Sequence, residues 1–323
     1  MSDRSKTLDV LSLGLNATDT LLRLPHFPTL DSKVALLSSH ILPGGQAASA
    51  AIACHRWGLR TRYIGKIGDD WAGRLQRAEM ARENVEAFWI EVPGAPSQTA
   101  YILIDQPSGE RTVLWQHDPR IALTTADLPR DLIAQTRLLH VDGHPPGPAA
   151  VAAQWAREAG AVVTADLDNL YPGVEELLAS VDYLLSSREF PKRVTGIADI
   201  PAALCELHRR FGCRVVGATL GRDGVIAWDG TTFHYSPGFV MDTIDTTGAG
   251  DIFHAGFAYA LLSGQTLDDA LEFSCAAAAW NCTALGARGG IRPVSELDQL
   301  IREGRRYPSC FDGERLHLAA STK

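Results

Sequence analysis

The chain has 323 residues, 46% of them hydrophobic and 21% charged, a composition typical of a globular protein that excludes a mainly disordered or collagen-like chain. Thirty Lys and Arg residues against 38 Asp and Glu residues give a formal net charge of −8. This acidic balance lacks the basic field that binds nucleic acid or an anionic membrane surface, so we expect a small-molecule partner instead.

The cysteines and the apolar segments both indicate a cytoplasmic protein. The six cysteines form no CxxC pair and no cluster at zinc-ligand spacing, so we expect them to be reduced thiols. The first apolar stretch, Val10 to Leu15, lacks a small-residue cleavage site behind it, which favours a strand over a signal peptide. No apolar run approaches the roughly 18 residues that a membrane span requires.

The N-terminal part of the chain combines strands of a main sheet with segments of a smaller one. The apolar run Leu8 to Leu15 is typical of a buried parallel strand that leads into a site at its carboxyl end. Alternating residues, with a turn at 106–109, predict a small β lid formed by about 17–24, 32–43 and 98–117. Residues 45–57 have helical spacing, and 62–67 are predicted to form a further strand.

From Arg137 onward, predicted strands and helices alternate regularly. This alternation is the signature of right-handed βαβ units, so we expect an α/β fold with a doubly wound, mostly parallel central sheet and helices on both faces. Two long helical segments follow, Ala249 to Leu262 and Leu267 to Leu285, and 307–323 is predicted to be a loose tail. The preceding elements are strands over 138–143, 161–168, 182–187 and 214–221, helices over 148–159, 174–180 and 200–211, and a hairpin over 227–235.

The most informative segment, 242–257, places carboxylates, hydroxyls and glycines directly before an apolar helix. Gly248 and Gly250 allow backbone N–H groups to converge at the positive end of the helix dipole, which forms an anion site suited to a phosphate. Asp251 lies in the first helical turn, where a carboxylate can accept a proton from an attacking hydroxyl during phosphoryl transfer. The alternative is a helix whose first turn is merely capped and has no catalytic role. Glycine destabilises a helix, however, so the presence of Gly-Ala-Gly at this helix start requires an explanation other than capping.

Two motifs in this chain resemble the signatures of the ribokinase (PfkB) carbohydrate kinase family. The C-terminal signature, D-T-x-G-A-G-D-x-F, is matched in full by Asp245 to Phe253. The N-terminal signature is similar to residues 44–58, which begin Gly44-Gly45, and to residues 64–73. The resemblance extends from about Asp9 to Pro293 and therefore covers most of the chain.

The resemblance implies an ATP-dependent kinase that transfers the γ-phosphoryl of ATP to a hydroxymethyl group of a small sugar, of the pentose or ketohexose type. It implies a ribokinase-like fold, with a kinase domain over 1–306 and a tail over 307–323. By the same resemblance, Asp251 is the catalytic base, and the anion hole is formed by Gly248, Ala249 and Gly250. The implied cofactors are Mg²⁺, which would bridge the ATP phosphates, and a monovalent cation such as K⁺.

The resemblance also assigns binding residues. The sugar is expected to contact Asp19, Gly44, Gly45, Ser49, His144 and Asp251. The nucleotide is expected to contact Ser187, Thr219, Gly221, Gly224, Gly248, Gly250 and Ala276. The metal candidates are Asp245 and Thr247, together with carbonyls of the loop 284–290, for the monovalent cation, and Glu189 near Mg²⁺.

Departures from the family's pattern put the identity of the sugar in question. Ser49 stands where many sugar kinases of the family have Asn, so ribose itself is a doubtful substrate. The family's N-x-x-E stretch corresponds to Ser187-Arg188-Glu189, with Ser in place of Asn and Glu one position early. His144 is either a substrate contact or a solvated loop histidine.

Other polar residues have two interpretations each. Asp166 and Asp168 either belong to the surroundings of a metal or cap a turn at a strand end. His254 either assists Asp251 or lies on a helix face without a catalytic role, which is the commoner case. Two alternatives apply to Arg111, Arg288 and Arg292. They contact a phosphate or an acidic substrate, or they are simply solvated, which is the commoner case.

Two other functions stay open. The first is a kinase for a nucleoside, a phosphosugar or a sulfonated sugar, although the sequence around Gly44 to Ala48 and His144 supplies no Arg or Lys for an anionic substrate. The second is a non-catalytic sugar- or nucleotide-binding regulator, which would not need a base beside an anion hole. The edges and apolar face of a small exposed sheet favour a homodimer through the lid.

Overall fold

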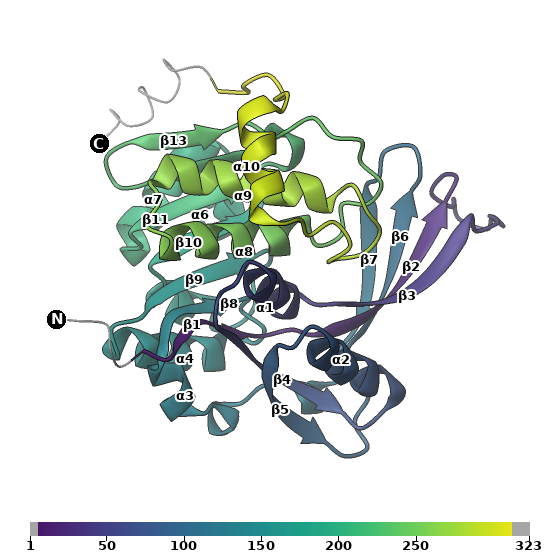
Figure 1. Ribbon diagram of the computed structural model, residues 1–323, viewed down its shortest axis with the longest axis horizontal. Helices are drawn as coiled ribbons and strands as arrows, with labels where there is room; N and C mark the ends of the chain where they lie inside the picture. The colour runs from purple at the N-terminus through teal and green to yellow at the C-terminus, as the bar shows by residue number, and fades with distance from the viewer. Residues whose placement is uncertain (1–5, 312–323) are drawn as a thin grey trace.

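A nine-stranded sheet forms the centre of the computed structural model, which describes residues 6–311 (Figure 1). The strand order is β13-β12-β11-β10-β9-β8-β1-β4-β5, in which the pairs β11–β12 and β12–β13 are antiparallel and the other neighbours are parallel. The carboxyl ends of the parallel strands therefore meet at one end of the sheet, where such folds bind ligands. The strands are β1 (Leu8–Leu13), β4 (Thr61–Gly68), β5 (Glu86–Val92), β8 (Thr136–Val141), β9 (Val162–Leu167), β10 (Tyr183–Ser187), β11 (Val215–Thr219), β12 (Val225–Trp228) and β13 (Phe233–Ser236).

Helices cover both faces of this sheet, and each face has its own apolar core. In β1, Leu11 and Leu13 belong to the core built with α3 to α7, whereas Val10 belongs to the core built with α1 and α8 to α10. Burial on both faces explains why the parallel strands are mostly apolar. The helices are α1 (Gln46–Arg56), α2 (Trp71–Arg82), α3 (Arg130–Ala134), α4 (Pro146–Glu158), α5 (Val174–Leu178), α6 (Phe190–Thr195), α7 (Ile200–Phe211), α8 (Ala249–Leu262), α9 (Leu267–Asn281) and α10 (Val294–Glu303), with short 3-10 turns at Pro119–Ile121, Thr125–Asp127 and Gly221–Asp223.

A separate four-stranded sheet, the lid, projects from the main body (Figure 1). Its order is β3-β2-β6-β7, in which β2 and β6 are parallel and the two edge strands are antiparallel to them. Leu21, Ala100, Ile102 and Ile104 form a small buried cluster on its inner face. The lid strands are β2 (Ala17–Leu24), β3 (Ser38–Gly44), β6 (Thr99–Asp105) and β7 (Arg111–Gln116).

The structure confirms the α/β fold with a mostly parallel sheet and a small β lid, and it corrects several boundaries. The second lid strand begins at Ser38 rather than at residue 32, because β2 ends at Leu24 and the intervening segment contains prolines and Asp31 in a left-handed conformation. The last long helix ends at Asn281 instead of Leu285. The sequence analysis did not identify α2, β5 or α10.

The predicted tail is attached to the body over its described part. Tyr307 donates a backbone hydrogen bond to the Gly238 carbonyl, and the ring of Phe311 lies 5.3 Å from that of Tyr235. Tyr307 and Phe311 therefore contact the body, whereas residues 308–310 are exposed. The rest of the predicted tail, 312–323, lies outside the described residues.

Trp57 connects α1 to the C-terminal helices, and its removal is expected to destabilise the fold. Its indole N–H donates to the Arg292 carbonyl at 2.8 Å, and its ring meets those of Tyr259 and Phe273 edge-on, each at 5.8 Å between centroids. Trp57→Ala should lower the free energy of unfolding by about 3–5 kcal/mol because it leaves a cavity. Urea unfolding measures this loss. Trp71→Ala is the matched control, since Trp71 is 52% exposed, and an equal loss in both variants would contradict the assignment.

Candidate active site

The turn before α8 has the conformation of an anion site. Gly248 occupies the N-cap in a left-handed conformation, φ 74°, and no side chain caps the helix. A Cβ at Gly248 would lie 2.3 Å from the Ala287 carbonyl oxygen, so only glycine permits this close packing. The Ala249 N–H already donates to the Thr246 carbonyl at 3.2 Å, whereas the N–H groups of Gly248 and Gly250 make no hydrogen bond to a described residue and, with the helix dipole, can receive a phosphate.

Asp251 stands in the first turn of α8, three residues after the N-cap. No described residue donates a hydrogen bond to its carboxylate. Burial raises the pKa of Asp251 to about 7, and the negative charge of Asp166 raises it further, while Arg111, His254 and Arg288 act in the opposite direction. A carboxyl group with a pKa near 7 is suited to act as a general base at neutral pH.

Asp19 supplies a second carboxylate from strand β2 of the lid. It packs directly against the backbone of Gly44, where a Cβ would lie 1.9 Å from the Asp19 Oδ2. Its side chain is buried, and no hydrogen bond to it is formed by another described residue. Burial raises the pKa of Asp19 to about 7, and Arg288 and Arg111 partly oppose this rise. The carboxylate is therefore free to bind a ligand hydroxyl.

The first turn of α1 lies beside Asp19. Gly45 is the N-cap of α1, and a Cβ there would lie 2.5 Å from the Asn16 Cα. Ser49 is fully buried, and its hydroxyl accepts a hydrogen bond from Arg288 Nε at 3.1 Å. Arg288 is itself buried, so its interpretation as a solvated arginine is wrong.

Two buried aspartates that end strands position the surrounding loops. Asp142, after β8, accepts hydrogen bonds from the backbone N–H groups of Leu15, Ala47 and His144. Burial raises the pKa of Asp142 to about 6. The sequence analysis noted this strand end but assigned Asp142 no role, because its partners lie up to 127 positions away.

Asp166 joins the catalytic helix to the α1 loop. Its Oδ1 lies 3.1 Å from Nε2 of His254, and its Oδ2 accepts a hydrogen bond from the Gln46 amide at 3.3 Å. His254 is 4% exposed and points into this cluster, with its ring 5.6 Å from the ring of His140. His254 is therefore a buried partner of Asp166 on the inner face of α8.

The nucleotide candidates gather at the ends of β10 and β11. Ser187 and Thr219 are paired in register, and the Thr219 hydroxyl donates to the Ser186 carbonyl. Gly221 has a φ of 64° and open space around it, whereas Gly224, with a φ of 88°, is required by contact with the Ser236 carbonyl. Ala276 is fully buried in the apolar core, so its predicted adenine contact is wrong for the side chain; Ala279, one turn later, is partly exposed.

The metal candidates differ in how well they fit a cation. Asp245 Oδ1 accepts from the backbone N–H and hydroxyl of Thr247, and Oδ2 accepts from the Gly286 N–H. The carbonyls of Thr247 and Ala287 both accept from the Asn281 amide. This all-oxygen set has the chemistry of a hard-cation site, but its oxygens already hold hydrogen bonds. Glu189 is exposed, and residues 6–311 contain no group of three or more His, Cys, Asp or Glu side chains that could hold a metal.

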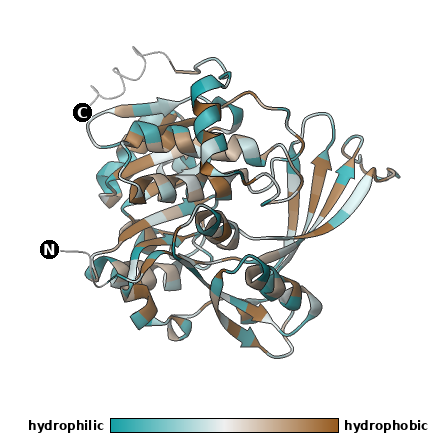
Figure 2. Cartoon of the chain, in the orientation of Figure 1, coloured by the Kyte–Doolittle hydropathy of each residue, from teal (hydrophilic) through white to brown (hydrophobic). Residues whose placement is uncertain are grey.

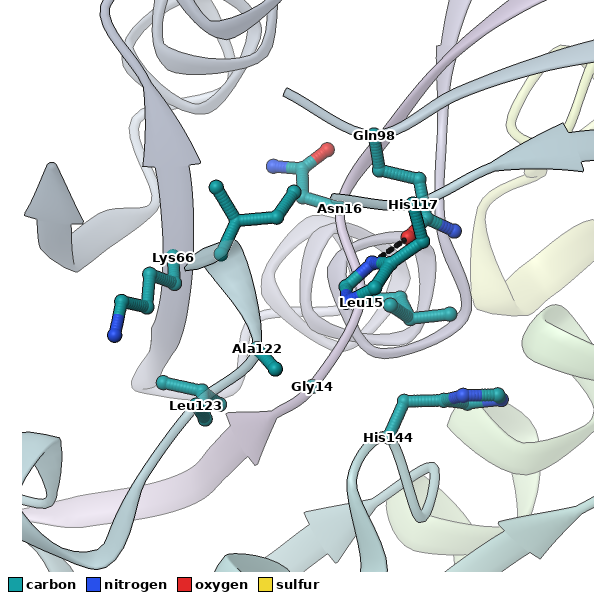
Figure 3. Close-up of a pocket in the computed structure, with 10 residues that line it drawn as sticks. Gly14, Leu15, Asn16, Lys66, Gln98, His117, Ala122, Leu123 and His144 are labelled. Carbon is teal, nitrogen blue, oxygen red and sulfur yellow. Dashed lines mark hydrogen bonds between the residues drawn. The ribbon is translucent and has the colours of Figure 1, made fainter. Parts of the chain in front are cut away.

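A polar pocket opens at the end of β1, between the main sheet and the base of the lid (Figure 3). Asn16 lines it with both amide atoms buried and unpartnered. His117 Nδ1 and Gln98 Oε1 lie 2.7 Å apart on its wall, and His144 faces it from the other side. His144 is therefore a pocket residue rather than a solvated loop histidine. The sequence analysis missed Asn16, Gln98 and His117, since none stands in a motif it used.

The lid contacts the segment that precedes the anion site. Arg111 Nη1 donates to the Thr246 hydroxyl at 3.1 Å, and the Thr246 N–H and hydroxyl both lie 3.2 Å from the Gly109 carbonyl. The lid turn and the catalytic turn are thus joined by three polar contacts.

Comparison with known proteins identifies the family of this chain. Residues 20–293 match the family model described as pfkB family carbohydrate kinase. The chain belongs to this family. The pfkB-family kinases transfer a phosphoryl group to an alcohol group of an acceptor, and relatives of the chain are named as kinases.

Relatives cover nearly the whole pfkB-family chain. An ATP-dependent ribose-1-phosphate kinase of Halopiger xanaduensis is 31% identical over 86% of this chain and 93% of its own. A ribokinase of Haemophilus influenzae is 29% identical over 92% and 98% of the two chains. The structure of Arabidopsis thaliana ribokinase with ribose and ATP superimposes with a TM-score of 0.77 at 22% identity, covering 91% and 99%, and confirms the ribokinase-like fold.

The pKa values of Asp19 and Asp251 predict an unusual pH dependence. Both carboxyl groups have pKa values of about 7, and the roles that the resemblance implies need both in the ionised form, Asp19 to bind one hydroxyl and Asp251 to accept the proton of another. The value of kcat/KM should therefore fall below about pH 7, more steeply than one proton predicts. A pH profile measured at constant ionic strength tests this. An acid limb centred near pH 4, the ordinary range of carboxyl groups, would contradict it.

Proposed function

We propose that this protein is an ATP-dependent sugar kinase that phosphorylates a hydroxymethyl group of a small pentose or ketohexose. The observation that carries the proposal is the pair of unpartnered carboxylates, Asp251 beside the α8 anion turn and Asp19 against Gly44. Each has a pKa of about 7. This arrangement supports one group that binds a sugar hydroxyl and one that deprotonates another.

In the proposed reaction, Asp251 accepts the proton of the hydroxymethyl group as its oxygen forms a bond to the γ-phosphorus and the bond to ADP breaks. The first-turn amides around Gly248 to Gly250 stabilise charge on the transferring phosphoryl. Mg²⁺ supplies charge neutralisation at the ATP phosphates when bound. The lid excludes water, so that transfer to the sugar competes well against hydrolysis.

A neutral substrate is favoured by the balance of charges around the site. The structure brings Lys66 and Arg288 close to the predicted sugar region, so the sequence-based argument that no cation stands there is wrong. Lys66, however, is paired with Asp127 at 2.8 Å, and Arg288 faces Glu79 as well as Asp19. These two cations are already paired with carboxylates, which favours a neutral sugar over an anionic one.

The cation and the cellular location also belong to this proposal. Asp245 and the Thr247 carbonyl would hold K⁺, and Glu189 would approach the Mg²⁺ that accompanies ATP. Six cysteines without a disulfide among the described residues support a reducing, cytoplasmic location. None of the described helices is both long enough and apolar enough to cross a bilayer.

The outer face of the lid supports homodimerisation. Ile41, Thr20, Tyr101 and Leu114 are cross-strand partners and therefore share one face, and Ile41, Tyr101 and Leu114 are each more than half exposed. Hydrophobic residues are frequent along these strands (Figure 2). A second copy of this lid would cover the apolar row and the edge strands.

The proposed base predicts a selective loss of transfer. Asp251→Asn should reduce phosphorylation of every substrate by at least about 1,000-fold because no group accepts the hydroxyl proton, while ATP binding stays near wild type. ADP release should be measured with Mg-ATP and K⁺ against ribose, fructose, other ketohexoses, sulfonated and phosphorylated sugars, and nucleosides. Asp131→Asn, on the exposed side of α3, is the matched control.

The panel also distinguishes the alternatives. Turnover of one neutral sugar that disappears in Asp251→Asn supports the proposal and names the substrate. Turnover restricted to a nucleoside, a phosphosugar or a sulfonated sugar replaces the substrate class but keeps the base. If no compound of the panel causes ADP release while ATP binding is retained, the result favours a non-catalytic regulator.

The proposed dimer predicts a change in molar mass. Tyr101→Asp combined with Leu114→Asp places two charges in the apolar row and should convert a dimer into a monomer in light scattering after size exclusion. Phe88→Asp, on the edge strand β5 and 46% exposed, should leave the dimer intact. A monomeric wild-type protein at micromolar concentration would contradict the prediction.

A further inference from the structure

Arg288 is a buried cation that the proposed mechanism does not use. It lies in the loop after α9, is 5% exposed, and reaches back to the α1 loop, 239 to 244 positions earlier in the chain. Its Nη2 donates to the Gly44 carbonyl at 2.6 Å, and its Nε donates to the Ser49 hydroxyl at 3.1 Å. One guanidinium therefore binds both ends of the turn that opens α1.

The third nitrogen of the Arg288 guanidinium, Nη1, is buried and makes no hydrogen bond to a described residue. Its nearest carboxylate is Glu79 of α2, at 3.8 Å. The other groups that act on the charge of Arg288 are Asp19 of β2, Asp251 of α8 and Tyr63 of β4. Arg288 also lowers the pKa of Glu83, at the end of α2. The guanidinium is thus the fixed positive charge among these groups.

We infer that Arg288 is a positioning residue for the sugar side of the site, which fixes the Gly44 to Ser49 turn and favours the ionised form of the Asp19 and Asp251 carboxylates. This inference rests on the proposed function and deepens it. Two nitrogens of Arg288 are already bound, to the Gly44 carbonyl and the Ser49 hydroxyl, and the third lies nearest Glu79, so we assign Arg288 an indirect role. It acts through Asp19, which packs against Gly44.

Ser49 and Arg288 form one unit. Ser49 is 0% exposed and accepts the Nε hydrogen bond with a side chain of only two heavy atoms. A longer side chain at position 49 would need the space that the guanidinium fills. Ser49→Asn should therefore be harmful alone and less harmful together with Arg288→Gln, a non-additivity that independent residues would not show.

The test compares Arg288→Gln with Arg292→Gln, a matched control at an exposed arginine. KM is measured for the panel sugar that has the largest wild-type kcat/KM. Arg288→Gln should raise this KM by about 100-fold because the Gly44 to Ser49 turn is misplaced. The KM for Mg-ATP should change much less. The carboxyl ¹³C titration of the unliganded protein, assigned with Asp19→Asn and Asp251→Asn, should show both pKa values raised above wild type. Both pKa values should rise because removal of a nearby cation disfavours the ionised form of a carboxyl group.

A second variant keeps the test decisive. Arg288→Lys retains the charge but loses the planar fork, so the sugar KM should rise while the two carboxyl pKa values stay near wild type. If Arg288→Gln does not fold, this variant carries the test through its KM and through hydrogen exchange of amides 44–49, which should become faster.

Unchanged sugar KM, carboxyl pKa values and amide exchange, as in Arg292→Gln, would overturn the inference. The titration and the exchange need no turnover. They therefore decide the role of Arg288 even if no sugar of the panel is phosphorylated, an outcome that would count against the proposed function alone.

Discussion

The site depends on the cost of placing two carboxylates largely out of water without a hydrogen-bond partner, Asp19 buried and Asp251 half-buried. Asp19 and Asp251 are both in this condition, and burial is the largest cause of the raised pKa of each. An ionised carboxyl group in such a place is tolerated only because fixed positive charges stand near it. Arg288 and Arg111 supply that charge, and they come from a loop after α9 and from the lid. The geometry of the whole cleft is organised around this balance.

Close approach between the backbone and other groups is the second constraint, and it explains three glycines near the site. A Cβ at Gly44 would meet Asp19, a Cβ at Gly14 would lie 2.1 Å from Asp142, and a Cβ at Gly248 would meet the Ala287 carbonyl. In each case a polar oxygen rests against the main chain, where any side chain would displace it. These glycines therefore locate functional oxygens as much as they permit turns.

The sequence was most informative where local pattern decides the structure. The helices Ile200–Phe211 and Ala249–Leu262 were predicted with their observed bounds, because their apolar periodicity and flanking glycines mark the ends. Helix α2 was missed because its buried residues include Gly73, Gln76 and Glu79, which give no clear apolar stripe.

Within the site, motif residues such as Asp251 and Asp19 could be identified, whereas residues defined by distant partners could not. Asp166 pairs with His254, and Arg288 binds Ser49 and Gly44, through contacts that span long stretches of chain. No spacing rule in a single sequence reports such contacts. The solvated interpretation of Arg288 failed for this reason, since burial is a tertiary property.

The contact between the lid and the catalytic turn has a further consequence for the timing of catalysis. Arg111 belongs to the lid, and its charge favours ionisation of both Asp251 and Asp19. If the lid moved away from α8, this cation would leave Asp251 but stay with Asp19, which belongs to the same sheet, and Asp251 would take up a proton more readily at neutral pH. In such an open state Asp251 would more often be protonated, and closure over the sugar would restore the negative charge that the proposed proton transfer needs.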